Sequence, residues 1–157
     1  MNHREFVFVR LSPRLGLNAW QIIWAYMYVV AKAGFAAFSA NGPFWGIGKR
    51  RQAEFRARLA QGDTIEVLFV IDRTVVFSAE ITDFASGRVP VTSPWGGAMV
   101  PTAFGGGGEL NRTWFRLTNI GFWQGPGTSK MFFSGKSGKS LEEVLEHSQC
   151  SWGYLHF

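Results

Sequence analysis

The sequence feature that most constrains the fold is a pair of β-rich runs, 64–71 and 74–81, joined at Asp72-Arg73. Two such runs separated by only two residues predict a β-hairpin. Further β-rich segments lie at 5–11, 113–120, 130–134 and 152–157. Sheet is therefore expected to be the dominant element of the chain.

Three helices are expected beside this sheet. Asn18 can cap a helix over 18–33 that ends near Gly34, because apolar residues recur there at three- and four-residue spacing. Good helix formers predict a second helix over 52–60, with a basic face. Ser140 and Glu143 form a capping box for a short third helix to about residue 147. The predicted fold is α+β: a curved mixed sheet or small open β-barrel flanked by helices.

The helix over 18–33 is apolar nearly all round, so a membrane span has to be considered. Only Gln21 and Lys32 are strongly polar between residues 19 and 38. However, Gly34 interrupts the run, and the aromatic residues are spread along it instead of gathering at its ends. The pattern favours a buried or self-associating helix.

Composition suggests one domain, 1–157, with an anionic partner. Aromatic residues make up 16% of the chain, charged residues make up 17%, and the formal net charge is +5. Nucleic acid is the commonest partner of a basic surface that also carries aromatic side chains. A membrane surface is the competing interpretation.

The single cysteine, Cys150, excludes an internal disulfide framework and suits a reducing compartment. The first ten residues read as a strand and do not resemble a signal peptide. We therefore expect a cytoplasmic protein.

The segment 42–51 (GPFWGIGKRR) places two aromatic residues between glycines and then three cations. Glycines permit a close backbone approach, aromatic rings offer flat apolar faces, and cations attract phosphates. This chemistry indicates a recognition loop. The alternative, that Phe44 and Trp45 are core residues beside a solvated basic face, stays open.

Trp45 and Trp95 both lie beside glycine or proline in segments expected to reach the surface. The second tryptophan belongs to a long segment, 83–111, rich in Gly, Pro, Ser and Thr, which is predicted to be a functional loop. Two exposed indoles would form a slot for a flipped base, and a methyl group on that base would fill the slot better than hydrogen. The alternative is that both indoles anchor their loops to the core.

Residues for catalysis or metal binding are not evident. The segment 135–140 (GKSGKS) lacks the glycine spacing of a phosphate-binding P-loop, and His147 with Cys150 provides only one potential ligand pair. We therefore expect a protein that is not an enzyme and that uses no metal or other cofactor.

Taken in order along the chain, several motifs resemble the YTH and EVE domains of the PUA-like superfamily, which read modified nucleobases. They are a first strand ending in Arg10, the Gly-x-x-Trp loop at 42–45, the Gly-Asp turn into the hairpin, Ser93-Pro94-Trp95, the strand 114–117, and a late basic glycine turn at 135–143.

The resemblance implies an aromatic cage formed by Trp45 and Trp95, with Met99 or Phe104 as a third wall. It also implies that the main chain of Gly46 and the side chain of Ser12 read the base edge, where Ser12 replaces the family's usual Asn or Asp. Phosphate contacts are implied for Arg10 and Lys136, and the basic segment adds Lys49, Arg50 and Arg51.

The expected function is binding of methylated nucleic acid by flipping the modified base into the cage. The base is N6-methyladenine or 5-methylcytosine, and DNA is favoured. Because the fold begins close to Met1, we expect a stand-alone reader or the N-terminal sensor of a modification-dependent restriction system, with a fused or associated nuclease or ATPase. The alternatives are a reader of N6-methyladenosine in RNA, and an interaction or membrane-associated module that uses the helix 18–33.

Overall fold

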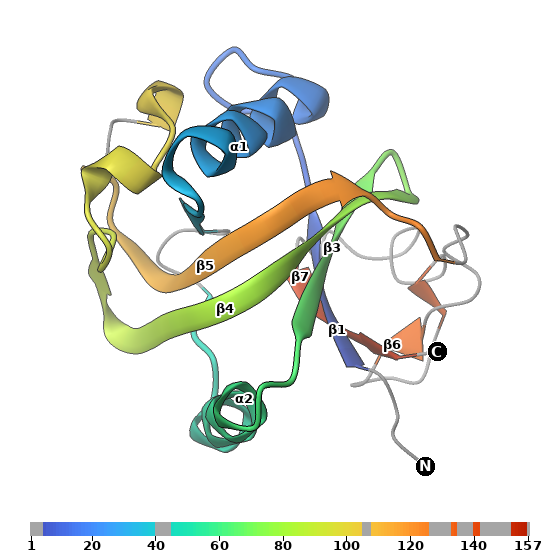
Figure 1. The fold of residues 1–157 in the computed structure, drawn as a ribbon. Helices are drawn as coiled ribbons and strands as arrows, with labels where there is room; N and C mark the ends of the chain where they lie inside the picture. The colour runs from blue at the N-terminus through green and yellow to red at the C-terminus, as the bar shows by residue number, and fades with distance from the viewer. Residues whose placement is uncertain are drawn as a thin grey trace.

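Seven strands form one curved mixed sheet, with one helix above it and one below it in the view of Figure 1. The structure is a computed structural model that describes residues 5–39, 45–104, 108–125, 133–134, 140–141 and 152–156. The strand order is β2-β5-β4-β3-β1-β7-β6. The elements are β1 (Glu5–Arg10), α1 (Ala19–Ala33), β2 (Ala36–Phe38), α2 (Lys49–Ala60), β3 (Ile65–Ile71), β4 (Thr74–Val91), β5 (Asn111–Phe122), β6 (Phe133–Ser134) and β7 (Trp152–His156), with two 3₁₀ turns at Gly97–Met99 and Thr102–Phe104.

The predicted hairpin is present as β3 and β4, which pair antiparallel around Asp72 and Arg73. β1 pairs with β3 in parallel, and β7 pairs antiparallel with the other side of β1. A parallel pair needs a crossover connection, which is supplied here by the segment containing α1, β2 and α2. The α+β class and the mixed sheet flanked by helices are thus as predicted.

Strand β4 extends ten residues further than its predicted end, from Ile81 to Val91. The expected loop at 83–111 is therefore wrong for its first part, which pairs with β5 through register shifts between Ile81 and Asp83 and between Ser86 and Val91. Bulges of this kind bend a strand and let it accommodate residues such as Gly87 and Pro90. The short strand β2 was not predicted. The helix expected from Ser140 lies outside the described residues except for Ser140 and Leu141.

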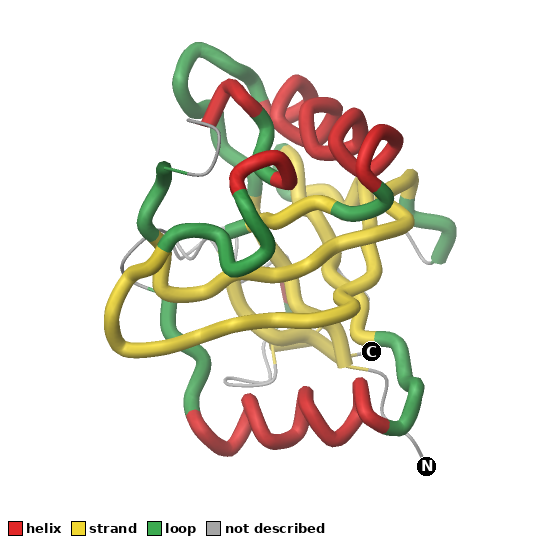
Figure 2. The backbone as a smooth tube through the Cα atoms, turned by 60° about the vertical axis from the view of Figure 1, so that its left-hand side comes forward, coloured by secondary structure: helices red, strands yellow, loops and turns green. Residues whose placement is uncertain are grey.

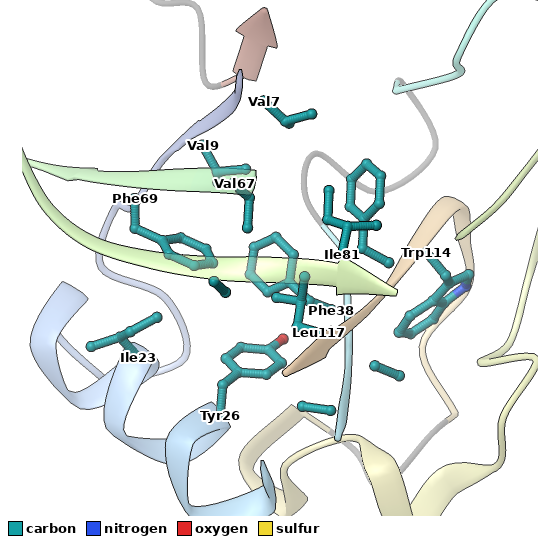
Figure 3. Packing of buried hydrophobic residues seen from close by; sticks show 14 of the residues in the cluster. Val7, Val9, Ile23, Tyr26, Phe38, Val67, Phe69, Ile81, Trp114 and Leu117 are labelled. Atoms are coloured by element: carbon teal, nitrogen blue, oxygen red, sulfur yellow. The ribbon is translucent and has the colours of Figure 1, made fainter. Parts of the chain in front are cut away.

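One face of the sheet packs against both helices. Val7 and Val9 of β1 belong to the same buried cluster as residues of α1 and Phe55 of α2, whereas Phe6 and Phe8 pack with Leu141 and Leu155 on the other face. The curved sheet lies between α1 and α2 (Figure 2). Tyr26 points from α1 toward Phe38 in this core (Figure 3).

Helix α1 begins and ends where the sequence predicts. Asn18 and Gln21 form a reciprocal capping box, and Gly34 ends the helix in a left-handed conformation with φ of 89°. A glycine adopts this conformation without the Cβ clash that other residues suffer. Among the described helices, none has both the length and the apolar character needed to cross a membrane.

The capping box gives a first prediction. Asn18→Ala removes the acceptor for the Gln21 amide, so we expect the free energy of unfolding to fall by about 1 kcal/mol in urea denaturation. Asn18→Asp is the control, because it keeps the acceptor and places a negative charge at the helix N-terminus. Equal destabilisation by both substitutions would contradict a capping role.

Candidate functional site

Trp45 lies in the core and not at the surface. Its exposed fraction is 0%. The indole stacks on Trp152 of β7, with ring centroids 4.5 Å apart and an interplanar angle of 14°, and it meets the edge of Phe115 at 5.2 Å. The expected surface exposure of Trp45 is wrong because β7 brings Trp152 next to the end of β1, where the Trp152 ring covers one face of the Trp45 indole.

A chain of hydrogen bonds fixes the backbone that follows Trp45. The Thr113 hydroxyl donates to the Trp45 carbonyl, so the Ser86 hydroxyl, 2.8 Å away, must donate to Thr113. The Ile47 amide in turn donates to Ser86 over 2.9 Å. Strands β4 and β5 therefore hold the segment 45–47 in one position, and with it the start of α2.

Gly46 lies within this anchored segment and touches a cation that the sequence did not single out. The Arg112 guanidinium occupies the place where a Cβ on residue 46 would lie, while its Nε donates to the Gly87 carbonyl over 2.9 Å. Among the described residues, no hydrogen bond uses the Gly46 amide. Arg112 was missed because β5 begins two residues before its predicted start.

The N-terminus of α2 carries an unusual concentration of positive charge. The helix begins at Lys49, three residues earlier than predicted, so Lys49, Arg50 and Arg51 occupy its first turn. Its N-cap, Gly48, has no side chain to cap the free amides, and the first turn contains no acid. Cations at this end oppose the helix dipole, whereas an anion is stabilised by the dipole and the free amides together.

An open groove runs beside this helix start and has a volume of about 560 Å³. We call it the α2 groove; it is lined by Glu5, Gly46, Gly48, Arg50, Arg51, Glu54, Trp152 and Tyr154. Burial raises the pKa of Tyr154, an effect opposed by the nearby Trp45 indole N–H and the Arg51 guanidinium and reinforced by Glu5. The Trp45 indole N–H is itself buried and forms no hydrogen bond of normal geometry among the described residues.

The three predicted cations of α2 differ in their availability to a ligand. Arg51 is paired with Glu5, and its guanidinium lies 3.6 Å from the centroid of the Tyr154 ring. The Arg50 side chain is 96% exposed and forms a surface pair with Glu54 at 3.5 Å, which contributes little to stability. Lys49 is exposed and takes part in none of the salt bridges among the described residues. Lys49 and Arg50 are thus better placed than Arg51 to bind a phosphate.

A second pocket lies between the end of β1 and α1 and has a volume of about 240 Å³. We call it the β1 pocket; its lining includes Arg10, Ser12, Arg14, Tyr26, Ser39 and Phe104. Tyr26 stacks on Phe104, with centroids 5.6 Å apart and an angle of 19° between the rings. Burial raises the pKa of Tyr26, an effect reinforced by Glu109 and opposed by Arg14, so its hydroxyl keeps its proton at a pH where a free tyrosine ionises.

Arg14 lies across this pocket. Its guanidinium is 5.2 Å from the centroid of the Phe104 ring and is paired with Glu109. The Arg14 side chain remains 45% exposed, so this pair is worth about 0–1 kcal/mol, and the cation–π contact adds about as much. A flat ligand that gains more than this by stacking on Phe104 can displace the guanidinium.

The predicted site residues therefore fall into separate groups. Arg10, Ser12 and Phe104 line the β1 pocket, and Gly46, Arg50 and Arg51 line the α2 groove. Trp95 and Met99 are half-buried against the core and line neither. Lys136 lies outside the described residues.

Within the described part of the chain, no group of three or more His, Cys, Asp or Glu side chains gathers in a metal-binding arrangement. Comparison with known proteins finds no matching family model, curated protein or solved structure.

The burial of Trp45 gives a second prediction. Trp45→Ala removes a fully buried indole and should lower the free energy of unfolding by about 3–5 kcal/mol. Trp95→Ala is the matched control. Because this indole is only half-buried, its removal should lower the free energy of unfolding by about 1–2 kcal/mol. Chemical denaturation of both variants gives the comparison. A Trp45→Ala protein as stable as wild type would show that the Trp45–Trp152 stack is not part of the core.

Proposed function

We propose that this chain is a non-enzymatic module that binds nucleic acid and accepts one modified base into the β1 pocket. The observation that carries the proposal is that Arg10 and Ser12, at the end of β1, line one pocket together with Phe104, which lies more than ninety residues further along the chain. Ligand pockets are typically apolar with a few polar groups, and this one has apolar walls with Ser12 and two arginines beside them. A single base is the size of ligand that this volume suits.

Stacking supplies the binding energy in this proposal. Phe104 provides the flat face once Arg14 has moved aside, and base stacking on an aromatic side chain is worth about 1–3 kcal/mol. The middle of this range, about 2 kcal/mol, exceeds the middle of the range for displacing Arg14, about 1 kcal/mol for the ion pair and the cation–π contact together. A methyl group on the base adds about 0.8 kcal/mol of apolar burial, which is the basis for preferring the modified form. In this proposal the Ser12 hydroxyl, on the pocket lining, forms a hydrogen bond to the base edge and so contributes specificity.

The phosphates are held outside the pocket in this proposal. Lys49 and Arg50, together with the free amides at the start of α2, form the main anion site, and Arg10 contacts the phosphate beside the flipped base. Lys136 is retained as a further phosphate ligand on the strength of the family resemblance. Trp45 supports the site through its anchored backbone, not through an exposed ring.

We further propose that the chain has a YTH- or EVE-like fold of the PUA-like kind. The support is the order of its parts: a first strand ending in a cation, a tryptophan segment before α2, the β3–β4 hairpin, and a last strand beside the first. Methylated DNA is the favoured ligand, with a nuclease or ATPase as the fused or associated partner. We place the module in the cytoplasm because its one cysteine suits a reducing compartment.

The pocket gives a third prediction. Ser12 is exposed and lies on the pocket lining, so Ser12→Tyr should block the entrance while leaving the fold intact. We expect affinity for a methylated single strand to fall about tenfold or more, with loss of preference over the unmodified strand. Thr64→Tyr, at an exposed position away from the pocket, is the control. Unchanged affinity and preference in Ser12→Tyr, measured by fluorescence anisotropy, would exclude the β1 pocket.

The helix start gives a fourth prediction. The double substitution Lys49→Gln and Arg50→Gln should weaken binding to modified and unmodified strands equally, because phosphate contacts carry no base information. The slope of log K against log salt should become shallower by about 1.4 for a single strand if both side chains contact phosphates.

The matched control removes the same charge from the other end of α2. Arg56→Gln with Arg58→Gln should change the salt slope much less, since these arginines contact the Phe84 ring and the Thr64 carbonyl. Equal effects of the two double variants would mean that α2 attracts nucleic acid only through its overall charge.

A further inference from the structure

The outer face of α1 carries a row of exposed aromatic side chains that the proposed function does not use. Trp20, Trp24 and Tyr28 are 37%, 56% and 62% exposed, and their four-residue spacing places them on one stripe of the helix. We call them the α1 stripe. Helix α1 turns its other face, with Ile22 and Tyr26, into the core.

The patch continues beyond the helix. Trp20 contacts the edge of Phe77 at 5.3 Å, and Phe77 stacks at 4.8 Å on Phe122, which is itself 61% exposed. Taking about 150–250 Å² per aromatic side chain, these four exposed rings leave roughly 300–550 Å² of aromatic surface in water. A patch of that size equals the largest apolar patch on a typical monomer, and such patches are often functional.

We propose that the α1 stripe is the centre of a two-fold interface between two copies of this chain. A standard interface buries about 800 Å² on each partner, with an apolar core inside a polar rim. The exposed aromatic surface is about half of this, which is the share expected of the core. Asn18, Gln21 and Lys32 are exposed on the same helix and belong to the rim.

The spacing of the stripe favours a second copy over an unrelated partner. In an antiparallel pairing of two α1 helices about Trp24, each Trp24 meets its counterpart and each Trp20 meets the partner's Tyr28. A two-fold interface requires this kind of self-complementarity. Such a pairing also brings Lys32, which lies 5.2 Å from its own Tyr28 ring, toward the partner's Trp20, where a cation–π contact is favourable.

The surface beside the stripe offers a receptor for a large side chain. A groove of about 290 Å³ lies between α1 and the 3₁₀ turns, lined by Tyr28, Val29, Ala98 and Pro101 among others. In the antiparallel pairing, the partner's Trp20 comes close to this groove. Interfaces gain most of their affinity from aromatic anchors that fill such pockets.

Charge also favours self-association over a lipid surface. Lys32 is the only charged residue of α1, so two helices can approach without strong repulsion even though each chain has a net charge of +5. An interfacial membrane helix, in contrast, carries several cations on its polar face to bind anionic lipid.

The test is the mass of the full chain in solution without nucleic acid. Sedimentation velocity over a range of protein concentrations should show a species of twice the 17.5 kDa monomer mass. Trp24→Glu should weaken the dimer about a hundredfold or more, because it places two carboxylates at the two-fold axis. Val89→Glu is the control: Val89 is 71% exposed on β4, away from the stripe, and its substitution should leave the dimer intact.

A second measurement fixes the geometry. In a Cys150→Ser background, Trp24→Cys should form an intermolecular disulfide under mild oxidation far faster than Val89→Cys, because only residue 24 meets its own copy. A monomeric wild-type chain would overturn the proposal, as would a dimer unaffected by Trp24→Glu. A monomer that floats with anionic lipid vesicles, and loses this property in Trp24→Glu, would assign the stripe to a membrane instead.

Discussion

The arrangement of the candidate site depends on the burial of Trp45. Its indole stacks on Trp152, and its carbonyl accepts a hydrogen bond from Thr113, so one residue joins the last strand, the core and β5. This contact fixes where the chain leaves the sheet and where α2 begins. The free amides and cations at the start of α2 are therefore placed by a core contact several residues away. Trp45 thus positions the candidate site although its own side chain is buried.

The structure separates cations that already contact other side chains of the chain from cations that extend into solvent. Arg51 and Arg14 each combine an ion pair with a contact to an aromatic ring, and both are occupied within the molecule. Lys49 and Arg50 extend into solvent. Helix α1 is divided in a similar way, since Tyr26 lines the β1 pocket while the α1 stripe faces outward. Self-association through the stripe would thus leave the face of α1 that lines the pocket uncovered.

Sequence patterns predicted the elements whose signals are local. The hairpin, the caps of α1 and the strands β1, β5 and β7 were predictable because alternation, capping residues and turns lie within each segment. The extension of β4 was missed because Gly87 and Pro90 read as loop residues, whereas Ser86 and Val91 on either side of them pair with β5 and carry the strand past them. The site was harder to predict. Trp45 lies in a glycine-rich segment and is expected to be exposed unless its stacking partner, Trp152, is known. Arg112 can be recognised as part of the site only from its contact with Gly46, which the sequence does not show. Long-range contacts of this kind leave no periodic trace in one sequence.

The central claim is that one modified base is recognised. The most direct measurement is the affinity of the wild-type chain for one short oligonucleotide prepared as DNA and as RNA, each unmodified, methylated on adenine N6, and methylated on cytosine C5. The account predicts tighter binding to one methylated form, by about fourfold or more from the apolar contribution of a methyl group. Equal affinity for all forms, with a strong salt dependence, would show binding through phosphates alone and would contradict recognition of a base.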